Sequence, residues 1–226
     1  TTLFRSLRKS VGWRVYLESG AIRMAFFGFS SGLPLLLVLG TLGFWLREAG
    51  VDLKTIGFMS WIGLIYGLKW SWAPLVDRLP IPILTHWLGQ RRSWLLVAQL
   101  GVMLGLFATA FADPQINLGI LAVSTVGTAF ASATQDIALD AYRIESADSR
   151  QAAYAAMYQA GYRMGMIWAG AGALAFAAWA AGDASGYLHS AWGVSYSVMA
   201  MSMSVGIVTT LFAPEPAAKE QRVQTV

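Results

Sequence analysis

Long apolar runs alternate with short polar segments along the chain. Six of these runs are long enough to cross a bilayer, which takes about 20 residues in a helix. They cover residues 24–46, 55–76, 93–112, 116–142, 152–181 and 189–213. The pattern predicts an all-α polytopic membrane protein with six transmembrane helices joined by short connections.

The two ends of the chain have a different character from the apolar runs. Within residues 1–19, Leu3, Phe4, Leu7 and Val11 recur at helical spacing among basic residues, which predicts a cytoplasmic amphipathic segment lying in the membrane interface. Residues 20–213 then form the six-helix bundle, and residues 214–226 form a polar cytoplasmic tail. No cleavable signal peptide is expected, because the first 20 residues contain no apolar core that ends in small residues.

Composition agrees with a membrane protein. The 226 residues are 56% hydrophobic and 12% charged, whereas soluble domains carry about 25% charged residues. The chain has no cysteine, so disulfides are excluded. The basic residues lie in the loops and not on one soluble face, so the expected partner is the lipid bilayer and not nucleic acid.

Lysine and arginine are distributed unequally between the two sides of the predicted bundle. Twelve of them fall on the side of the two termini and only Arg47 and Lys54 on the other. Because positive residues are retained on the cytoplasmic side, both termini are predicted to be cytoplasmic.

Four charged residues lie inside the apolar runs: Lys69, Asp136, Asp140 and Arg163. The two aspartates are four residues apart on one helix face, and an aspartate in hydrocarbon costs about 2.5–3.5 kcal/mol on insertion scales. The fourth and fifth helices are predicted to form an antiparallel pair, in which Asp136 and Arg163 differ in depth by only about 5 Å, so that Arg163 can pair with Asp136 across the hairpin. The alternatives are that Asp140 caps its helix and that the two cations extend to the interface.

Glycine and proline indicate how the helices pack. Gly32-Leu33-Pro34 predicts a kink in the first helix, which either lines a pathway or shapes packing. Four Gly-x-x-x-Gly pairs predict close helix contacts: Gly28/Gly32, Gly63/Gly67, Gly101/Gly105 and Gly161/Gly165.

Enzymatic chemistry has little support in this sequence. Intramembrane aspartyl proteases need their aspartates on two helices, whereas Asp136 and Asp140 share one. His86 and His189 are far apart in the chain, so no metal site is expected. No phosphate-binding loop or serine nucleophile motif is present, and we expect no cofactor.

The loop between the second and third runs carries a recognisable motif. Asp77-Arg78, followed after an insertion by Gly89-Gln90-Arg91-Arg92, resembles the G-x-x-x-D-R-x-G-R-R loop of the major facilitator superfamily, although Ala73 replaces the leading glycine. Pro214-Glu215-Pro216 resembles the motif that ends the first half of that superfamily. The resemblance makes Asp77, Arg78, Arg91 and Arg92 candidates for a cytoplasmic gate.

Further motifs resemble the AmpG-type muropeptide permease family over about residues 15–216. They are Ser31-Gly32-Leu33-Pro34, Trp72-Ala73-Pro74-Leu75-Val76-Asp77-Arg78, Ala133-Thr134-Gln135-Asp136-Ile137-Ala138-Leu139-Asp140-Ala141 and Gly161-Tyr162-Arg163-Met164-Gly165-Met166. The resemblance implies the N-terminal bundle of the superfamily, built from two inverted three-helix repeats. It also implies a proton-coupled importer of anhydromuropeptides in the bacterial inner membrane. Eukaryotic acetyl-CoA transporters are relatives of that family, so the substrate does not follow from the fold.

On this reading, Asp136 and Asp140 are the candidates for proton coupling and Arg163 for charge pairing or anion binding. Gln135, Lys69 and Pro34 are expected near the same pathway. Six helices are half of a twelve-helix transporter, so the expected partner is a C-terminal six-helix half or another membrane protein, with a small glycopeptide as substrate. The alternative is a non-transporting subunit or assembly factor that docks a larger membrane complex through its cavity-facing helices.

Overall fold

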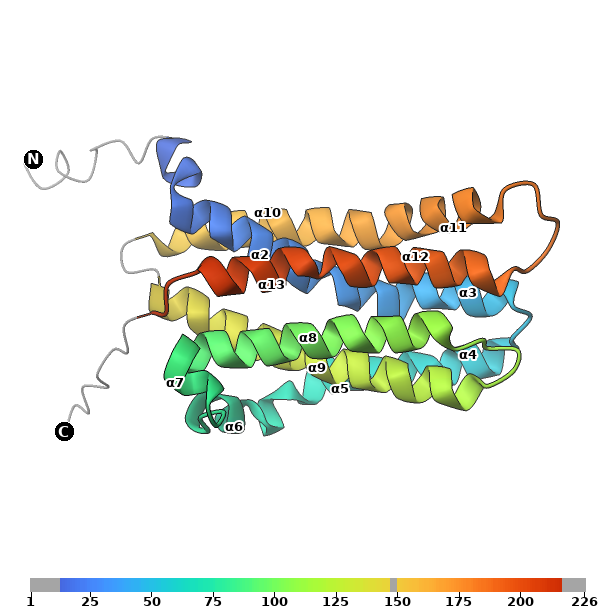
Figure 1. Cartoon of the computed structure of the whole chain (residues 1–226), viewed down its shortest axis with the longest axis horizontal. Coiled ribbons are helices and arrows are strands. Elements are labelled where there is room, and N and C mark those ends of the chain that lie inside the picture. The colour runs from blue at the N-terminus through green and yellow to red at the C-terminus, as the bar shows by residue number, and fades with distance from the viewer. Residues whose placement is uncertain (1–12, 147–149, 217–226) are drawn as a thin grey trace, which may run out of the picture.

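The structure is a computed structural model that describes residues 13–146 and 150–216, and these residues form helices and loops without strands. Five helical stretches are long and apolar enough to cross a membrane: Ser19–Glu48, Gln90–Phe111, Leu118–Ser146, Gln151–Ala181 and His189–Phe212. They lie side by side along one axis, and the two ends of the described chain lie at the same end of the bundle (Figure 1). The prediction of an all-α polytopic membrane protein is confirmed.

The elements follow in a simple order. A short 3-10 helix, Trp13–Leu17, precedes the first long stretch, which consists of α2 (Ser19–Leu36), a π-helical turn at Leu37–Thr41 and α3 (Leu42–Glu48). The later stretches are α8 (Gln90–Phe111), α9 (Leu118–Ser146), α10 (Gln151–Ile167) with a second π-helical turn at Trp168–Gly172, α11 (Ala173–Ala181), α12 (His189–Ser202) and α13 (Ser204–Phe212). Leu3, Phe4, Leu7 and Val11, on which the amphipathic segment was predicted, lie outside the described residues, as does the tail beyond residue 216.

The second predicted span, residues 55–76, is not one continuous helix, so that prediction is wrong in detail. The chain there forms α4 (Leu53–Met59), α5 (Leu64–Leu68) and α6 (Ala73–Arg78), with 3-10 turns at Ser60–Gly63 and Lys69–Ser71 between them. Glycine at 57, 63 and 67 weakens an α-helix by about 1 kcal/mol each relative to alanine. These segments nevertheless follow one another along the bundle axis, and α7 (Leu84–Leu88) leads from them into α8 (Figure 1).

Helices α2 and α10 touch through their backbones. A Cβ atom added to Gly28 or Gly32 would collide with the carbonyl oxygens of Tyr158 and Tyr162, and one added to Gly161 would collide with that of Ala25. Two glycine pairs, one on each helix, therefore face each other, which is the geometry that small-residue motifs permit between membrane helices.

The other two glycine pairs differ from each other. On α8, Gly101 and Gly105 face Ala131 and Thr128 of α9. Residues 53–78, with their short helical segments, are called the segmented pass below. There, a Cβ on Gly67 would meet nothing within 4 Å. The predicted close packing therefore holds for Gly101/Gly105, and it is wrong for Gly63/Gly67.

Helices α9 and α10 do not form the predicted antiparallel pair. Helix α10 packs along α2, whereas α9 packs mainly along α8 and partly on α2 (Figure 1). Consecutive helices were expected to be neighbours because their connection is short. The glycine faces of α2 and α10 instead hold α10 along α2, and α10 touches α9 only over a short stretch.

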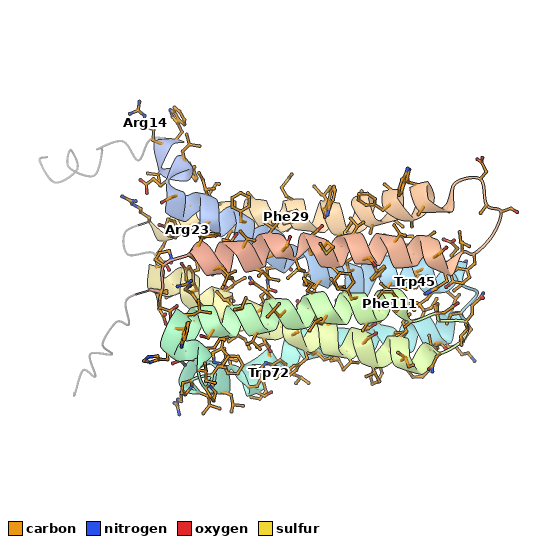
Figure 2. The ribbon with its side chains drawn as sticks, viewed as in Figure 1. Arg14, Arg23, Phe29, Trp45, Trp72 and Phe111 are labelled. Carbon is orange, nitrogen blue, oxygen red and sulfur yellow. The ribbon has the colours of Figure 1, made fainter. Side chains whose placement is uncertain are left out.

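Aromatic side chains hold the end of the bundle that lies away from the chain termini. Trp45 of α3 stacks on Trp192 of α12, with ring centroids 5.8 Å apart and planes at 2°. Its indole N–H donates to the Tyr187 hydroxyl at 3.2 Å, and that hydroxyl donates to Asp113 at 3.1 Å. Trp45 and Arg23 mark the two opposite ends in Figure 2.

The packing of α2 on α10 makes a stability prediction. We expect Gly161→Ala to lower the free energy of unfolding by about 1–3 kcal/mol, because the added methyl group must displace the α2 backbone. Gly127→Ala on α9 is the matched control, since a Cβ there meets nothing within 4 Å. Thermal unfolding in detergent, followed by tryptophan fluorescence, measures both variants. Equal midpoints for the two variants would show that this contact is not tight.

Candidate functional site

Asp136 lies where three helices meet. The Ser31 hydroxyl of α2 donates a hydrogen bond to Asp136 Oδ1 on α9, and the Tyr158 hydroxyl of α10 donates to Ser31 Oγ at 3.1 Å. Ser31 is only 1% exposed, because it lies between Gly28 and Gly32 on the face of α2 that α10 covers. The close helix packing therefore brings the tyrosine hydroxyl to the serine and, through it, to the aspartate.

Asp140, one turn further along α9, has charged partners instead. Lys69 Nζ lies 4.0 Å from Asp140 Oδ2, and Arg143 Nη2 lies 3.2 Å from Asp140 Oδ1. The Asp140 side chain is 48% exposed and that of Lys69 36%, so these ion pairs lie on an open face of the bundle. The Arg143 guanidinium is also 5.4 Å from the centre of the Tyr158 ring, a cation–π contact.

Gln135 adds a polar group next to Asp136. Its side chain is buried, its amide nitrogen lies 3.4 Å from Ser30 Oγ, and its Oε1 has no hydrogen-bond partner within the described residues. The Tyr66 hydroxyl of α5 is likewise buried without a partner there. Buried polar groups are nearly always paired, so these two are exceptions among the buried polar groups of the bundle.

Arg163 does not take part in this cluster, and the predicted Asp136–Arg163 pair is wrong. The Arg163 side chain is exposed, its nearest polar contact is Met166 Sδ at 4.0 Å, and it forms no ion pair with any residue of 13–146 or 150–216. Gly161 and Gly165 face α2, and a residue two positions from each points about 200° away from that face. Asp136 and Arg163 lie at similar depths on consecutive helices, but their side chains do not face each other.

Pro34 is buried within α2, which continues to Leu36 before the π-helical turn. The Tyr196 hydroxyl donates to the carbonyl of Leu37 at 2.9 Å, and the Thr41 hydroxyl donates to the carbonyl of Ala169 at 2.9 Å. Side chains of neighbouring segments thus pair with carbonyls on both π-helical turns, as membrane helices require when their backbone is irregular.

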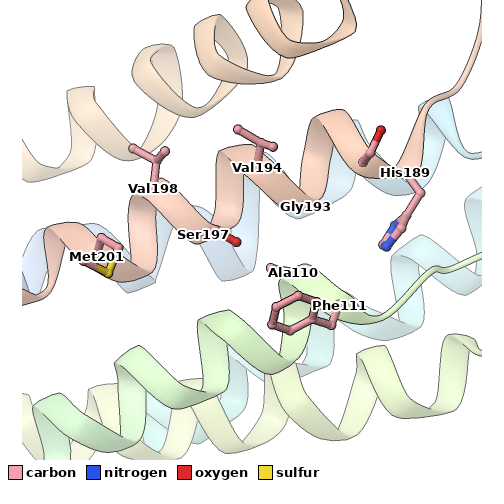
Figure 3. A pocket seen from close by; sticks show the side chains of 9 residues that line it. Ala110, Phe111, His189, Gly193, Val194, Ser197, Val198 and Met201 are labelled. Carbon is pink, nitrogen blue, oxygen red and sulfur yellow. The ribbon is translucent and has the colours of Figure 1, made fainter.

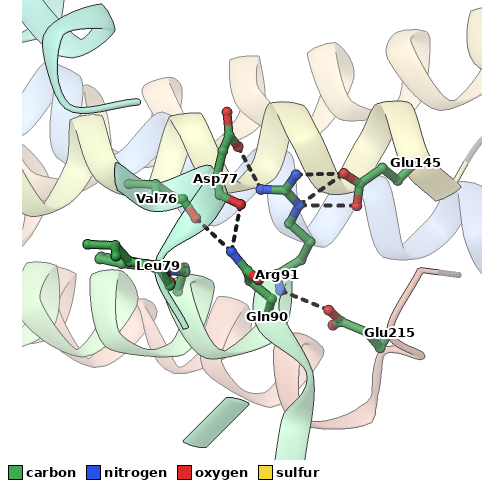
Figure 4. A network of polar contacts seen from close by, with 8 residues as sticks. Val76, Asp77, Leu79, Gln90, Arg91, Glu145 and Glu215 are labelled. Atoms are coloured by element: carbon green, nitrogen blue, oxygen red, sulfur yellow. Dashed lines mark hydrogen bonds and ion pairs between the residues drawn. The ribbon is translucent and has the colours of Figure 1, made fainter. Parts of the chain in front are cut away.

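A second polar cluster surrounds Arg91 at the end of the bundle where the chain termini lie (Figure 4). Arg91 donates to Asp77 Oδ1 at 2.7 Å, and its Nη2 and Nε donate to the Glu145 carboxylate at 2.6–3.1 Å. The Gln90 amide donates to the Asp77 carbonyl oxygen at 2.7 Å. A guanidinium fork across a carboxylate is a strong and directional pairing, so it ties α6, α8 and α9 together.

Glu215 completes this cluster from the far end of the chain. Its carboxylate accepts the backbone N–H groups of Arg91 at 2.8 Å and Arg92 at 3.2 Å, which are free donors at the start of α8. Gly89 allows this approach, because it has φ of +87° and a Cβ there would collide with the Glu215 side chain. The Arg92 guanidinium donates in turn to the carbonyls of Thr210 and Leu211 at 2.9 and 2.6 Å.

The four predicted gate residues therefore have different surroundings. Asp77 and Arg91 pair, Arg92 binds the last turn of α13, and Arg78 is exposed without an ion pair in the described part of the chain. The sequence had signalled position 215 through its Pro-Glu-Pro motif, but not its role as a helix cap. Nothing in the spacing of the sequence pointed to Glu145.

The cavities of the bundle are mostly separate from these residues. A hollow of about 560 Å³ lies between α8 and α12, and the side chains around it are largely apolar (Figure 3). It is lined by Ala110, Phe111, His189, Ser190, Gly193, Val194, Ser197, Val198 and Met201. A smaller cavity of about 240 Å³ borders the Arg91 cluster, with Arg23, Glu145 and Glu215 in its wall.

The chain is similar to known membrane transporters. The family described as acetyl-coenzyme A transporter 1 matches residues 24–212. The anhydromuropeptide permease of Escherichia coli strain K12 is 38% identical over 204 residues, which cover 90% of this chain and 39% of the permease. A Rickettsia felis protein that carries the name AmpG 4 is 32% identical over 211 residues, or 93% of this chain and 49% of that protein.

The chain thus spans between about two fifths and half of the length of these two relatives. The matched region contains the Asp136 site and most of the Arg91 cluster, with Glu215 just beyond it. Because the family match extends over most of the sequence, the chain belongs to the acetyl-coenzyme A transporter 1 family of membrane transporters, in agreement with the muropeptide-permease resemblance of its motifs.

Proposed function

We propose that this chain forms one half of a proton-coupled importer of anhydromuropeptides in the bacterial inner membrane. The observation that carries the proposal is the setting of Asp136, a carboxylate inside the spanning bundle whose hydrogen-bond partner is the neutral Ser31 hydroxyl. A carboxylate held by a salt bridge resists protonation, whereas one held by a hydroxyl can gain and lose a proton without breaking an ion pair. The name of the Escherichia coli permease supplies the substrate class.

The two aspartates have separate roles in this proposal. Asp136 carries the proton. Asp140 forms ion pairs with Lys69 and Arg143 and thereby holds Lys69 beside Asp136. This assignment narrows the sequence-based prediction, which gave proton coupling to both residues.

The surroundings of Arg163 favour an anionic substrate. It is an exposed cation on the face of α10 that points away from α2, and no acidic side chain of the described residues pairs with it. An unpaired cation within a membrane-spanning helix is costly unless an anion or water meets it. We propose that it binds a carboxylate of the peptide part of the substrate, with Lys69 further along the same pathway and the buried Gln135 and Pro34 supporting the helices beside it.

The proposed topology has six spans with both termini in the cytoplasm. The five long helical stretches and the segmented pass of residues 53–78 would make up the six spans, in two inverted repeats of three. The excess of Lys and Arg on the side of the termini gives the orientation. Since the chain spans at most about half of the two relatives, a second six-helix bundle would supply the opposite wall of the pathway.

In this topology the Arg91 cluster is the cytoplasmic gate. Asp77, Arg91 and Arg92 brace the ends of α6, α8 and α13 against one another, and the exposed Arg78 is available to the opposite bundle. Rocking of the two bundles would make and break contacts at this end while the cluster keeps this half rigid.

The proton role of Asp136 is tested by uptake. In the transport-competent protein that contains this chain, Asp136→Asn is expected to lower uptake of a labelled anhydromuropeptide at least tenfold and to abolish its dependence on external pH, because an amide carries no exchangeable carboxyl proton. The measurement is the initial rate in reconstituted vesicles with an imposed proton gradient. Asp140→Asn is the matched control on the same helix face and should slow uptake while leaving its pH dependence in place. Uptake by Asp136→Asn that still follows pH would refute the assignment.

The brace at Arg91 makes a separate prediction. Arg91→Lys keeps the charge but loses the fork on Glu145, so we expect a loss of about 1.5–3 kcal/mol in unfolding free energy together with slower uptake. Arg150→Lys at the same end of the bundle, where the pair with Glu18 is more exposed, is the control and should unfold at the temperature of the unchanged protein. If Arg91→Lys and Arg150→Lys unfold at the same midpoint, Arg91 does not brace the bundle.

A further inference from the structure

A chain of two hydroxyl groups ends on Asp136. Ser31 has a single hydroxyl proton, and it is directed to the Asp136 carboxylate. The Tyr158 hydroxyl, 3.1 Å from Ser31 Oγ, must therefore be the donor in its own contact. The order of donors is Tyr158 to Ser31 to Asp136 as long as the carboxylate is ionised.

This order can reverse as a unit. A protonated Asp136 becomes a donor, Ser31 can then accept from it and turn its own proton toward Tyr158, and the tyrosine oxygen can accept. No heavy atom has to move for this reversal. Both ionisation states of Asp136 are thus served by the same two hydroxyl groups.

Other groups surround Asp136 without bonding to it. Lys69 and Tyr66 face it from the segmented pass, Asp140 from its own helix, and Tyr162 from α10. Within the described residues, only Ser31 makes a side-chain hydrogen bond to the Asp136 carboxylate. In this part of the chain, side-chain hydrogen bonding can therefore affect the protonation of Asp136 only through Ser31.

Tyr158 is itself held in place by charge. Its ring carries the Arg143 guanidinium at 5.4 Å, and Arg143 pairs with Asp140 at 3.2 Å. A cation over the ring draws electron density from it and makes the hydroxyl a better donor. Hydrogen bonds in a chain strengthen one another, so a better donor at Tyr158 strengthens the bond from Ser31 to Asp136.

We propose that Tyr158, acting through Ser31, is a positioning residue that sets the pH range over which Asp136 exchanges its proton. The inference rests on the proposed function, since it deepens the role given to Asp136. It adds that α10 contributes to proton coupling through a neutral tyrosine and not through its intramembrane cation, Arg163.

The test is the pH profile of uptake by the transport-competent protein that contains this chain. The probe is a labelled anhydro-N-acetylmuramyl peptide, and the initial rate is measured from about pH 5 to pH 8.5 for Tyr158→Phe, Ser31→Ala, Ser31→Cys and the double variant Tyr158→Phe/Ser31→Ala. Tyr162→Phe is the matched control, because this tyrosine is one turn away on α10, its ring centre is 6.1 Å from that of Tyr158, and its hydroxyl makes no hydrogen bond within the described residues. Ser31→Cys keeps the volume of the side chain with a weak donor and guards against misfolding of Ser31→Ala.

Removing a donor from the ionised carboxylate should raise the pH at which uptake is half-maximal. For Ser31→Ala we expect a rise of about one pH unit, the effect of one hydrogen bond to a charged group. For Tyr158→Phe we expect about 0.3 pH unit, the cooperative share of that bond. Tyr162→Phe should follow the unchanged protein, and the double variant should equal Ser31→Ala, because the tyrosine acts only through the serine.

Each other outcome has a distinct meaning. If uptake by the unsubstituted protein depends on pH, and Tyr158→Phe and the Ser31 variants give the same pH profile, the inference is overturned and the proposed function still stands. A shift by Tyr158→Phe that persists in full in the Ser31→Ala background also overturns it, since the route through Ser31 would be wrong. Uptake by the unchanged protein that ignores pH altogether overturns the inference and the proposed proton coupling together.

Discussion

The contact between the backbones of α2 and α10 is the constraint on which the site depends. Lipid offers little hydrophobic drive for helices to associate, so close van der Waals packing between small residues has to hold them together. A Cβ atom on Gly28, Gly32, Gly161 or Gly165 would collide with the backbone of the facing helix. This contact buries Ser31, brings α10 against α2, and places the Tyr158 hydroxyl beside the serine that binds Asp136.

Helix α9 contributes two carboxylates whose surroundings differ although they are one turn apart. Asp136 meets a neutral hydroxyl, and Asp140 meets two cations. An ion pair stabilises the charged form of a carboxylate, while a hydroxyl can serve either form. The two carboxylates therefore differ in the kind of group that each one contacts, and Lys69 pairs with Asp140.

The two ends of the bundle are held by different chemistry. At the end with the termini, Arg91 and Glu215 join four segments through charged hydrogen bonds. At the other end, Trp45 stacks with Trp192 and reaches Tyr187 through its indole N–H. Between them the pass of residues 53–78 is broken into short helical segments and packs loosely at Gly67. A bundle braced at both ends, with one irregular pass along its edge, fits a protein whose proposed activity needs relative movement of bundles.

The sequence alone determined where most of the helices run, the glycines that pack α2 on α10, the unusual position of Asp136 and Asp140, and the motif that contains Asp77 and Arg91. Each of these depends on local pattern or on a resemblance. Only the tertiary structure decided that α10 lies against α2, that Arg163 points away from Asp136, that Lys69 reaches Asp140, and that Glu145 and Glu215 meet Arg91. The physical reason is that a membrane helix is apolar on nearly every face, so its hydrophobic pattern does not show which face meets a neighbour. That choice depends on contacts between residues far apart in the chain.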